Sequence, residues 1–154
     1  MRWTILMIFL IPSFFTAFAA CNNGSKGSPA QSNSNDTTTN KMKIKIGSKT
    51  FTASLFNNPT VAAFKEMLPL TLNMTELNGN EKYFHLSTSL PTNASNPGTI
   101  HSGDLMLWGS NSLVLFYQTF STSYSYTKLG RFNDIEDLAA AVGSGSVIVT
   151  FEME

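Results

Sequence analysis

The hydrophobic pattern of the chain is organised around two dense apolar runs, at residues 105–108 and 113–117. The segment 109–112 between them, Gly-Ser-Asn-Ser, consists of turn-forming residues, so the two runs are predicted to form a β-hairpin. Neither run alternates apolar with polar residues, and a strand without alternation is usually covered by protein on both faces. We therefore expect the hairpin to lie near the middle of a small fold.

Further strands are predicted on both sides of this hairpin. In most of them apolar residues recur at every second position, as in a strand with one buried face, and turn residues such as Gly47 and Gly79 separate neighbouring segments. The predicted strands are 42–46, 51–55, 70–77, 83–86 and 147–151.

The Ser- and Tyr-rich segment 119–126 allows two interpretations. As a strand, it places Phe120, Thr122, Tyr124 and Tyr126 on one side. As an irregular segment, it resembles the binding rims formed by antibody loops, which are rich in the same residue types. The pattern alone leaves both interpretations open.

Two short helices are predicted between the strands. Asn58 is expected to cap the first, and a capping pair of Asn133 with Glu136 is expected to begin the second, after a leading segment 129–132. Gly143 is expected to end the second helix. The apolar faces consist of Val61, Phe64 and Leu68 in the first helix and Ile135, Leu138, Ala139 and Val142 in the second.

These elements together predict a mainly β fold. About eight strands can close into a barrel, which removes exposed sheet edges and fills the interior with side chains. The two short α-helices would then cover the barrel mouths or one flank. A closed barrel is preferred to an open sandwich because both runs of the central hairpin are expected to be covered on both faces.

The N-terminal segment 1–20 has the pattern of a signal peptide. Arg2 precedes an apolar stretch at 5–18, which is too short for a membrane span of about 20 residues, and small residues follow it. The tetrapeptide Phe-Ala-Ala-Cys at 18–21 resembles a bacterial lipobox, although Leu is usual where Phe18 stands. This resemblance implies lipidation of Cys21 and a membrane-anchored lipoprotein of the bacterial cell envelope. The alternative is an ordinary signal peptide with a free thiol left over.

A polar tether is predicted at 21–40, and the barrel domain at 41–154. The tether contains Ser, Asn and Thr but no large apolar residue, so it cannot bury enough surface to offset its ordering entropy. The chain has 154 residues, enough for one domain with a sizeable core. Its ten basic and ten acidic residues cancel, so no nucleic-acid partner is indicated. Cys21 is the one cysteine, which excludes an internal disulfide.

The domain resembles a known family in several ordered segments. The order of elements, together with GDLMLWG, LVLFYQTF, LGR and the closing helix followed by VIVTFE, is similar to the small bacterial cyclophilin-like domain family over residues 43–152. The resemblance implies a closed β-barrel of the cyclophilin type. Members of that family occur alone, as exported lipoproteins, or beside flavodoxin-like domains.

The resemblance also raises the question of prolyl isomerase activity. In true cyclophilins a Phe-His pair is followed by an arginine that polarises the prolyl amide. Here Phe84 and His85 are followed by Leu86, which cannot donate a hydrogen bond. Arg131 is the one arginine after the predicted signal peptide, and it lies before the second predicted helix. An active isomerase, or an accessory protein in flavin-linked redox chemistry, is therefore kept as the alternative function.

No other catalytic motif is evident. A metal site would need both histidines, His85 and His101, with a carboxylate such as Asp104, and that spacing is common by chance. The sequence contains no Gly-x-Ser-x-Gly nucleophile motif and no Gly-rich loop before a helix. No metal and no cofactor are predicted.

Aromatic residues with polar tips are the strongest binding candidates. Trp108 and Tyr117 could equally belong to the core or to a barrel mouth, whereas Tyr124 and Tyr126 lie in the Ser-rich segment. The predicted function is a binding or accessory module for a peptide or a small-molecule ligand. Its predicted pocket residues are Phe84, Trp108, Phe116, Gln118, Tyr124 and Arg131.

Overall fold

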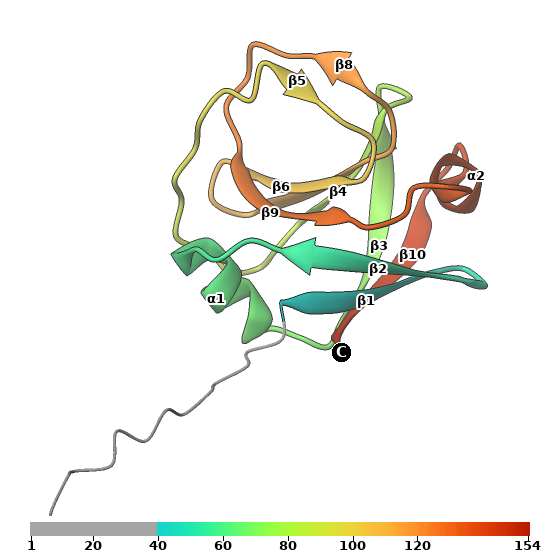
Figure 1. The fold of residues 1–154 in the computed structure, drawn as a ribbon, viewed down its shortest axis with the longest axis horizontal. Helices are drawn as coiled ribbons and strands as arrows, with labels where there is room; N and C mark the ends of the chain where they lie inside the picture. Colours follow the sequence, from blue (N-terminus) through green and yellow to red (C-terminus); the bar gives the residue numbers. More distant parts are fainter. Residues whose placement is uncertain (1–39) are drawn as a thin grey trace, which may run out of the picture. The chain divides into compact units, whose positions relative to one another are not determined.

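Eight antiparallel strands close into a barrel in the computed structural model, which describes residues 40–154 (Figure 1). The hydrogen-bonded order around the barrel is β1-β10-β3-β4-β7-β6-β9-β2, and β5 pairs with β8 in a separate two-stranded sheet. The elements are β1 (Lys41–Ile46), β2 (Lys49–Leu55), α1 (Pro59–Lys65), β3 (Leu70–Leu77), β4 (Glu81–His85), β5 (Thr99–Ile100), β6 (Asp104–Trp108), β7 (Ser112–Phe116), β8 (Phe120–Ser121), β9 (Thr127–Phe132), α2 (Leu138–Val142) and β10 (Val147–Met153). The prediction of a mainly β closed barrel with two short helices is confirmed.

The N-terminal predictions lie outside the described residues. They comprise the signal peptide 1–20, the lipidation site Cys21 and the tether 21–40, of which only residue 40 is described. Each therefore stays a prediction.

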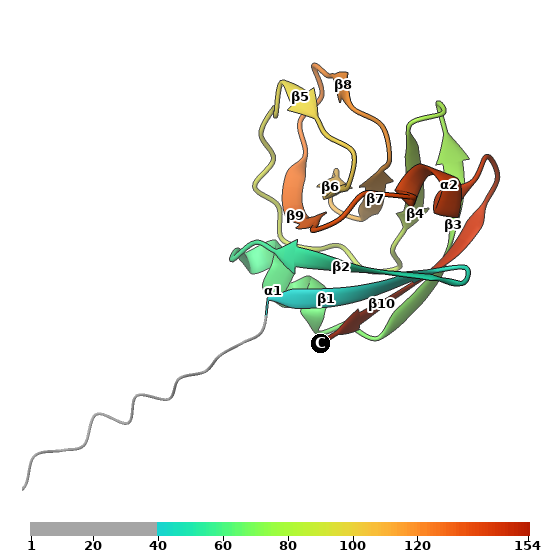
Figure 2. The same ribbon diagram turned by 45° about the vertical axis from the view of Figure 1, so that its right-hand side comes forward.

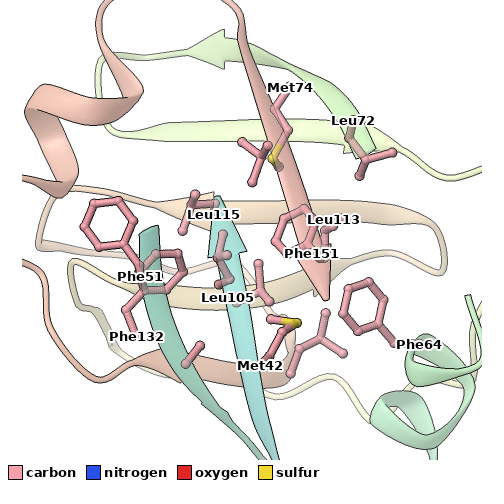
Figure 3. Packing of buried hydrophobic residues seen from close by; sticks show 14 of the residues in the cluster. Met42, Phe51, Phe64, Leu72, Met74, Leu105, Leu113, Leu115, Phe132 and Phe151 are labelled. Atoms are coloured by element: carbon pink, nitrogen blue, oxygen red, sulfur yellow. The ribbon is translucent and has the colours of Figure 1, made fainter. Parts of the chain in front are cut away.

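The predicted central hairpin is confirmed as β6 and β7, which pair in register from Leu105↔Leu115 to Trp108↔Ser112. Both of its faces are covered, as expected. The inner face contributes Leu105 and Leu113, among others, to the core that fills the barrel (Figure 3). The outer face contributes Met106, Val114 and Phe116 to a second apolar cluster, which also contains Ile100 and Tyr126.

The β5–β8 pair covers this outer cluster. Phe120 of β8 lies against the cluster, and its ring centroid is 5.7 Å from that of Phe116. In both ribbon views the pair lies across the barrel from β1 and β2 (Figures 1 and 2). The part of the barrel wall formed by β6 and β7 therefore has packed protein on both sides, which explains why the hairpin sequence does not alternate.

The helices lie at opposite ends of β1 (Figure 2). At one end, Lys65 of α1 donates to the Asn40 side chain, just before β1 begins. At the other, Lys49, beyond the β1–β2 turn, pairs with Asp137 at the start of α2. Buried residues of both helices, Phe64 and Leu138 among them, join the main core. Each helix therefore closes one end of the barrel.

The first helix begins as predicted, and the second does not. The Asn58 carboxamide oxygen accepts from the Val61 backbone N–H at 2.9 Å, and Pro59 occupies the first turn. Asn133 instead hydrogen-bonds to Ser54 and to Thr52 on β2, and α2 begins only at Leu138. The predicted capping pair was wrong because hydrogen bonds to the neighbouring strand claim the Asn133 side chain.

The strand β9 is a further correction, because the sequence pattern predicted residues 129–132 only as a segment that leads into the second helix. Leu105 pairs with Gly130 and Met106 pairs with Lys128, so Leu129 has no partner on β6 and forms a β-bulge. Gly130 also lies against β2, where an added Cβ would come within 2.6 Å of the Ser54 carbonyl oxygen. The bulge at Leu129 and the glycine at 130 interrupt the alternation of apolar and polar residues along β9, so the sequence pattern did not predict this strand.

Candidate functional site

A pocket of about 540 Å³ lies on the outer face of β4, β7 and β6. The turn between β3 and β4 borders it on one side, and the irregular segment 120–126 borders it on another. Its volume is within the range of about 300–1,000 Å³ that is usual for ligand sites. The residues that line this outer-face pocket are Leu77, Asn78, Asn80, Glu81, Tyr83, His85, Trp108, Ser112, Val114, Phe120, Ser121, Thr122, Ser123, Tyr124 and Tyr126.

Alternation along β4 decides which of its side chains reach the pocket. Glu81, Tyr83 and His85 line it. Lys82 and Phe84 belong to the opposite, inner face: Lys82 is fully buried, and Phe84 packs on the main core. A strand of five residues thus supplies an acidic, an aromatic and an imidazole side chain to one wall of the pocket.

Aromatic rings form much of the remaining lining. Trp108 and Tyr124 are 50% and 65% exposed, which is unusual for such large side chains. Tyr126 is buried and meets Phe116 edge to face, with ring centroids 5.5 Å apart. The segment 120–126 contains only the short strand β8, so it is mainly the irregular wall that its Ser and Tyr content allowed.

His85 and Ser112 form a polar pair in the pocket. The His85 Nδ1 atom lies 2.8 Å from the Ser112 hydroxyl oxygen, and the Tyr83 ring packs at 5.3 Å from the imidazole. Among the described residues no carboxylate hydrogen-bonds to His85. The pair therefore lacks the third member that orients the histidine in a hydrolase triad.

The end of the pocket near the β3–β4 turn is acidic. Burial, followed by the charge of Glu76, raises the pKa of Glu81. Within the described part of the chain, the Glu81 carboxylate has no hydrogen bond or ion pair. Asn80 Oδ1 is also buried without a hydrogen-bond partner in residues 40–154. Asn80 and Glu81, which are adjacent in the sequence, both line the pocket.

Behind this wall, Lys82, Glu76 and Tyr117 form a polar cluster, which we call the Lys82 cluster. The Lys82 ammonium group pairs with Glu76 and donates to the carbonyl oxygens of Gly143 and Gly145, each at 2.7 Å. The Tyr117 hydroxyl donates to both carboxylate oxygens of Glu76, at 2.9 and 2.8 Å. The cluster thus joins β3, β4, the end of β7 and the loop after α2.

Two pKa shifts follow from the Lys82 cluster. Burial opposes ionisation of Glu76, but hydrogen bonds from Lys82, Tyr117 and the Gly79 backbone outweigh it and hold the Glu76 pKa below its usual range. Burial, with the hydrogen bond to the anionic Glu76, raises the pKa of Tyr117 to about 12. The cluster therefore holds a carboxylate and a neutral phenol at neutral pH.

Arg131 lies outside the pocket lining. Its Nε donates to Asp104 Oδ1 at 2.6 Å, and the other Asp104 oxygen accepts from the His101 backbone N–H at 2.9 Å. Across residues 40–154, no group of three or more His, Cys, Asp or Glu side chains is arranged to hold a metal ion. Asp104 is thus engaged by the strand β9 and by the turn that precedes β6.

The six predicted pocket residues are only partly brought together. Trp108 and Tyr124 line the outer-face pocket. Phe84 packs on the main core, Phe116 is fully buried in the outer cluster, and Gln118 is exposed without lining the pocket. With Arg131 paired to Asp104, four of the six therefore lie elsewhere.

Sequence reasoning missed Asn80, Glu81, Tyr83 and Ser112 as site residues. A signal for two of them was present, because strict alternation from His85 back along the strand puts Tyr83 and Glu81 on the same face. For Asn80 and Ser112 no local signal exists, since their place in the lining depends on pairing between distant strands.

Among the helices of residues 40–154, none is both long and apolar enough to span a membrane. No curated protein matches the chain.

The family comparison agrees with the barrel. The sequence profile described as the cyclophilin-like family matches residues 44–152, a span that begins within β1, ends within β10 and contains all the strands between them. Since that span is well over half of the chain, the protein belongs to the cyclophilin-like family.

Proposed function

We propose that the domain is a binding module that holds a short peptide or a small ligand in the outer-face pocket. The observation that carries this proposal is the pocket itself: a cavity of about 540 Å³ lined by exposed aromatic rings with polar tips. Trp108 and Tyr124 offer large contact areas to solvent. Exposed rings of this kind are characteristic of recognition surfaces.

The proposed module is not an isomerase. Prolyl isomerisation needs a donor that weakens amide resonance, against a barrier of about 18–20 kcal/mol. Among the described residues that line the pocket there is neither Lys nor Arg. Arg131 is held by Asp104, and Leu86, which follows His85, is buried. These observations favour binding without catalysis.

The module is further proposed to be a lipoprotein of the bacterial cell envelope, anchored through acyl chains on Cys21. The support is the signal-peptide pattern at 1–20 and the lipobox-like residues that end at Cys21. A Cys21→Ser variant should be released from the membrane fraction. Processing and membrane attachment of this variant like the parent would contradict lipidation.

Binding is tested by the fluorescence anisotropy of a fluorescein-labelled prolyl tetrapeptide, titrated with the full chain in mild detergent. Trp108→Ala and Tyr124→Ala should each weaken binding, because both remove aromatic lining. Phe56→Ala is the matched control, since Phe56 is another exposed ring, 42% accessible, in a different hollow beside α1. Equal binding by all three variants and the parent would refute the proposed site.

Isomerase activity is tested separately, by exchange NMR on an unlabelled prolyl peptide. The cis-to-trans rate should equal the uncatalysed rate, which corresponds to tens to hundreds of seconds. A rate clearly above background that is abolished by Arg131→Ala would show that the alternative function is the correct one.

A further inference from the structure

We propose that the outer-face pocket selects a peptide segment with a lysine or arginine side chain, whose cationic group lies against Glu81. The inference rests on the binding function proposed above and names the chemical class of its ligand. It is carried by unsatisfied acceptors at one end of the pocket, by the charges of the lining and by the aromatic rings at the other end.

The first observation is the isolated Glu81 carboxylate. Four carboxylates of the described residues form ion pairs: Glu76 with Lys82, Asp104 with Arg131, Asp137 with Lys49, and Glu152 with Lys43 and Lys45. Glu81 is partly buried in the pocket and has no such partner within residues 40–154. A partly buried carboxylate without a partner is costly, and a ligand cation would remove that cost.

The second observation is the Asn80 carboxamide oxygen, which is buried without a donor in the described part of the chain. An ammonium or guanidinium group carries several N–H donors and no acceptor. It can therefore satisfy the Glu81 carboxylate, which lies beside Asn80 in the pocket lining. An anionic or acceptor-rich ligand could satisfy neither group.

The third observation is the charge of the surroundings. Neither Lys nor Arg is among the described lining residues. The basic neighbour on β4, Lys82, is fully buried on the inner face, and its ammonium group is bound to Glu76 and two backbone carbonyl oxygens. Glu76 acts on Glu81 through its charge. The acidic end therefore attracts a cation without a competing protein cation in the lining.

The occupant is inferred to be a peptide, because the pocket is longer than a free amine. Glu81 and His85 are four residues apart on one strand, about 13 Å at the usual strand rise of about 3.3 Å per residue. Trp108 pairs with Ser112, which itself pairs with His85, so the exposed indole lies at the end away from Glu81. An extended segment can place a cation at one end and an apolar or aromatic side chain at the other.

The test compares three unlabelled tetrapeptide amides that differ at one position: lysine, its uncharged analogue norleucine, and glutamate. Their dissociation constants are measured by isothermal titration calorimetry with the full chain in detergent. The lysine peptide should bind about tenfold more tightly than the norleucine peptide, from one ion pair and donor contacts in a partly buried site. The glutamate peptide should bind most weakly, and butylammonium alone should bind far more weakly than the lysine peptide.

Glu81→Gln keeps the shape of the side chain and removes its charge, so the preference for lysine over norleucine should fall to about twofold or less. Glu66→Gln is the matched control, because Glu66 is an exposed residue at the C-cap of α1 and does not line the pocket. It should keep the full preference.

The outcomes separate the inference from the proposed function. Equal binding of the lysine and norleucine peptides, or a lysine preference that survives Glu81→Gln, overturns the cationic selectivity while binding itself stands. Binding of butylammonium as tight as that of the lysine peptide overturns the peptide assignment. If no peptide binds the parent, the proposed function fails and the inference fails with it.

Discussion

Replacement of Lys82 by methionine is expected to destabilise the barrel by about 2–4 kcal/mol, although Lys82 does not line the outer-face pocket. The Lys82 side chain is fully buried, and its ammonium group joins Glu76 to the carbonyl oxygens of Gly143 and Gly145. Methionine has a similar length and keeps the apolar stem packed. The substitution therefore removes the charge and its donors with little change of volume.

The magnitude follows from the groups that lose a partner. A charge-assisted hydrogen bond contributes about 1.5–3 kcal/mol, and removal of one member of a fully buried ion pair costs about 3–5 kcal/mol. The full cost does not apply, because the Glu76 side chain is 22% exposed and keeps its hydrogen bonds from Tyr117 and Gly79. The carbonyls of Gly143 and Gly145 belong to exposed residues that water can reach, so their loss adds only about 1 kcal/mol.

The assay is urea unfolding of the full chain in detergent, followed by far-ultraviolet circular dichroism. The free energy of unfolding is extrapolated to water, and an unchanged m-value is required for the comparison. Lys45→Met is the matched control, because Lys45 is 48% exposed and pairs with Glu152 at 3.2 Å on the surface. An exposed pair contributes at most about 1 kcal/mol, so this variant should remain close to the parent.

A Lys82→Met variant within about 0.5 kcal/mol of the parent would refute the reasoning, since surface substitutions commonly fall in that range. Equal losses for Lys82→Met and Lys45→Met would refute it as well. Either result would mean that the Lys82 cluster does not join β4 to the loop after α2 in solution.

Three further predictions concern stability. Gly130→Ala should lose about 1–3 kcal/mol because its Cβ would meet the Ser54 carbonyl oxygen, whereas Gly145→Ala, with open space around it, should change little on urea unfolding. Because the folded pKa of Glu76 lies below its unfolded value of 4.5, its contribution is complete above that value and is lost as the pH falls through the folded pKa. The stability profile of Glu76→Gln should therefore be flatter in acid, and an equally steep profile would contradict this. The pKa of Glu81 is instead raised above its unfolded value of 4.5, so ionisation of this carboxylate lowers the stability of the fold as the pH rises through the folded pKa. Glu81→Gln should therefore raise the melting temperature at neutral pH. An unchanged or lower melting temperature would contradict the assignment of Glu81 as an unpaired carboxylate.

Much of the barrel could be predicted because its strands obey local rules. Residues Met42, Ile44 and Ile46 alternate along β1, and the unbroken apolar runs of β6 and β7 correspond to a wall covered on both faces. The strand β9 could not be predicted this way. Its bulge at Leu129 and its glycine at Gly130 exist because of contacts with β6 and β2, which are distant in the sequence.

Less of the candidate site than of the barrel could be predicted from the sequence, because the site too depends on contacts between strands that are distant in the sequence. Trp108 and Tyr124 could be proposed from residue type alone. The acidic end of the pocket depends on which strands pair with β4, and on Lys82 pointing inward while Glu81 points outward. Composition shows ten acidic residues but not which of them lies in the pocket lining without a basic partner.

The most direct test of the account is to map the ligand site by NMR on the isotope-labelled full chain in detergent. Adding the lysine tetrapeptide should shift backbone amide signals of residues 80, 81, 83, 85, 108, 112, 120–124 and 126, which line the outer-face pocket. Signals from residues 56–62 beside α1 should not move. Shifts confined to that second hollow, or no shifts at saturating peptide, would contradict the claim that this barrel binds its ligand on the outer face of β4.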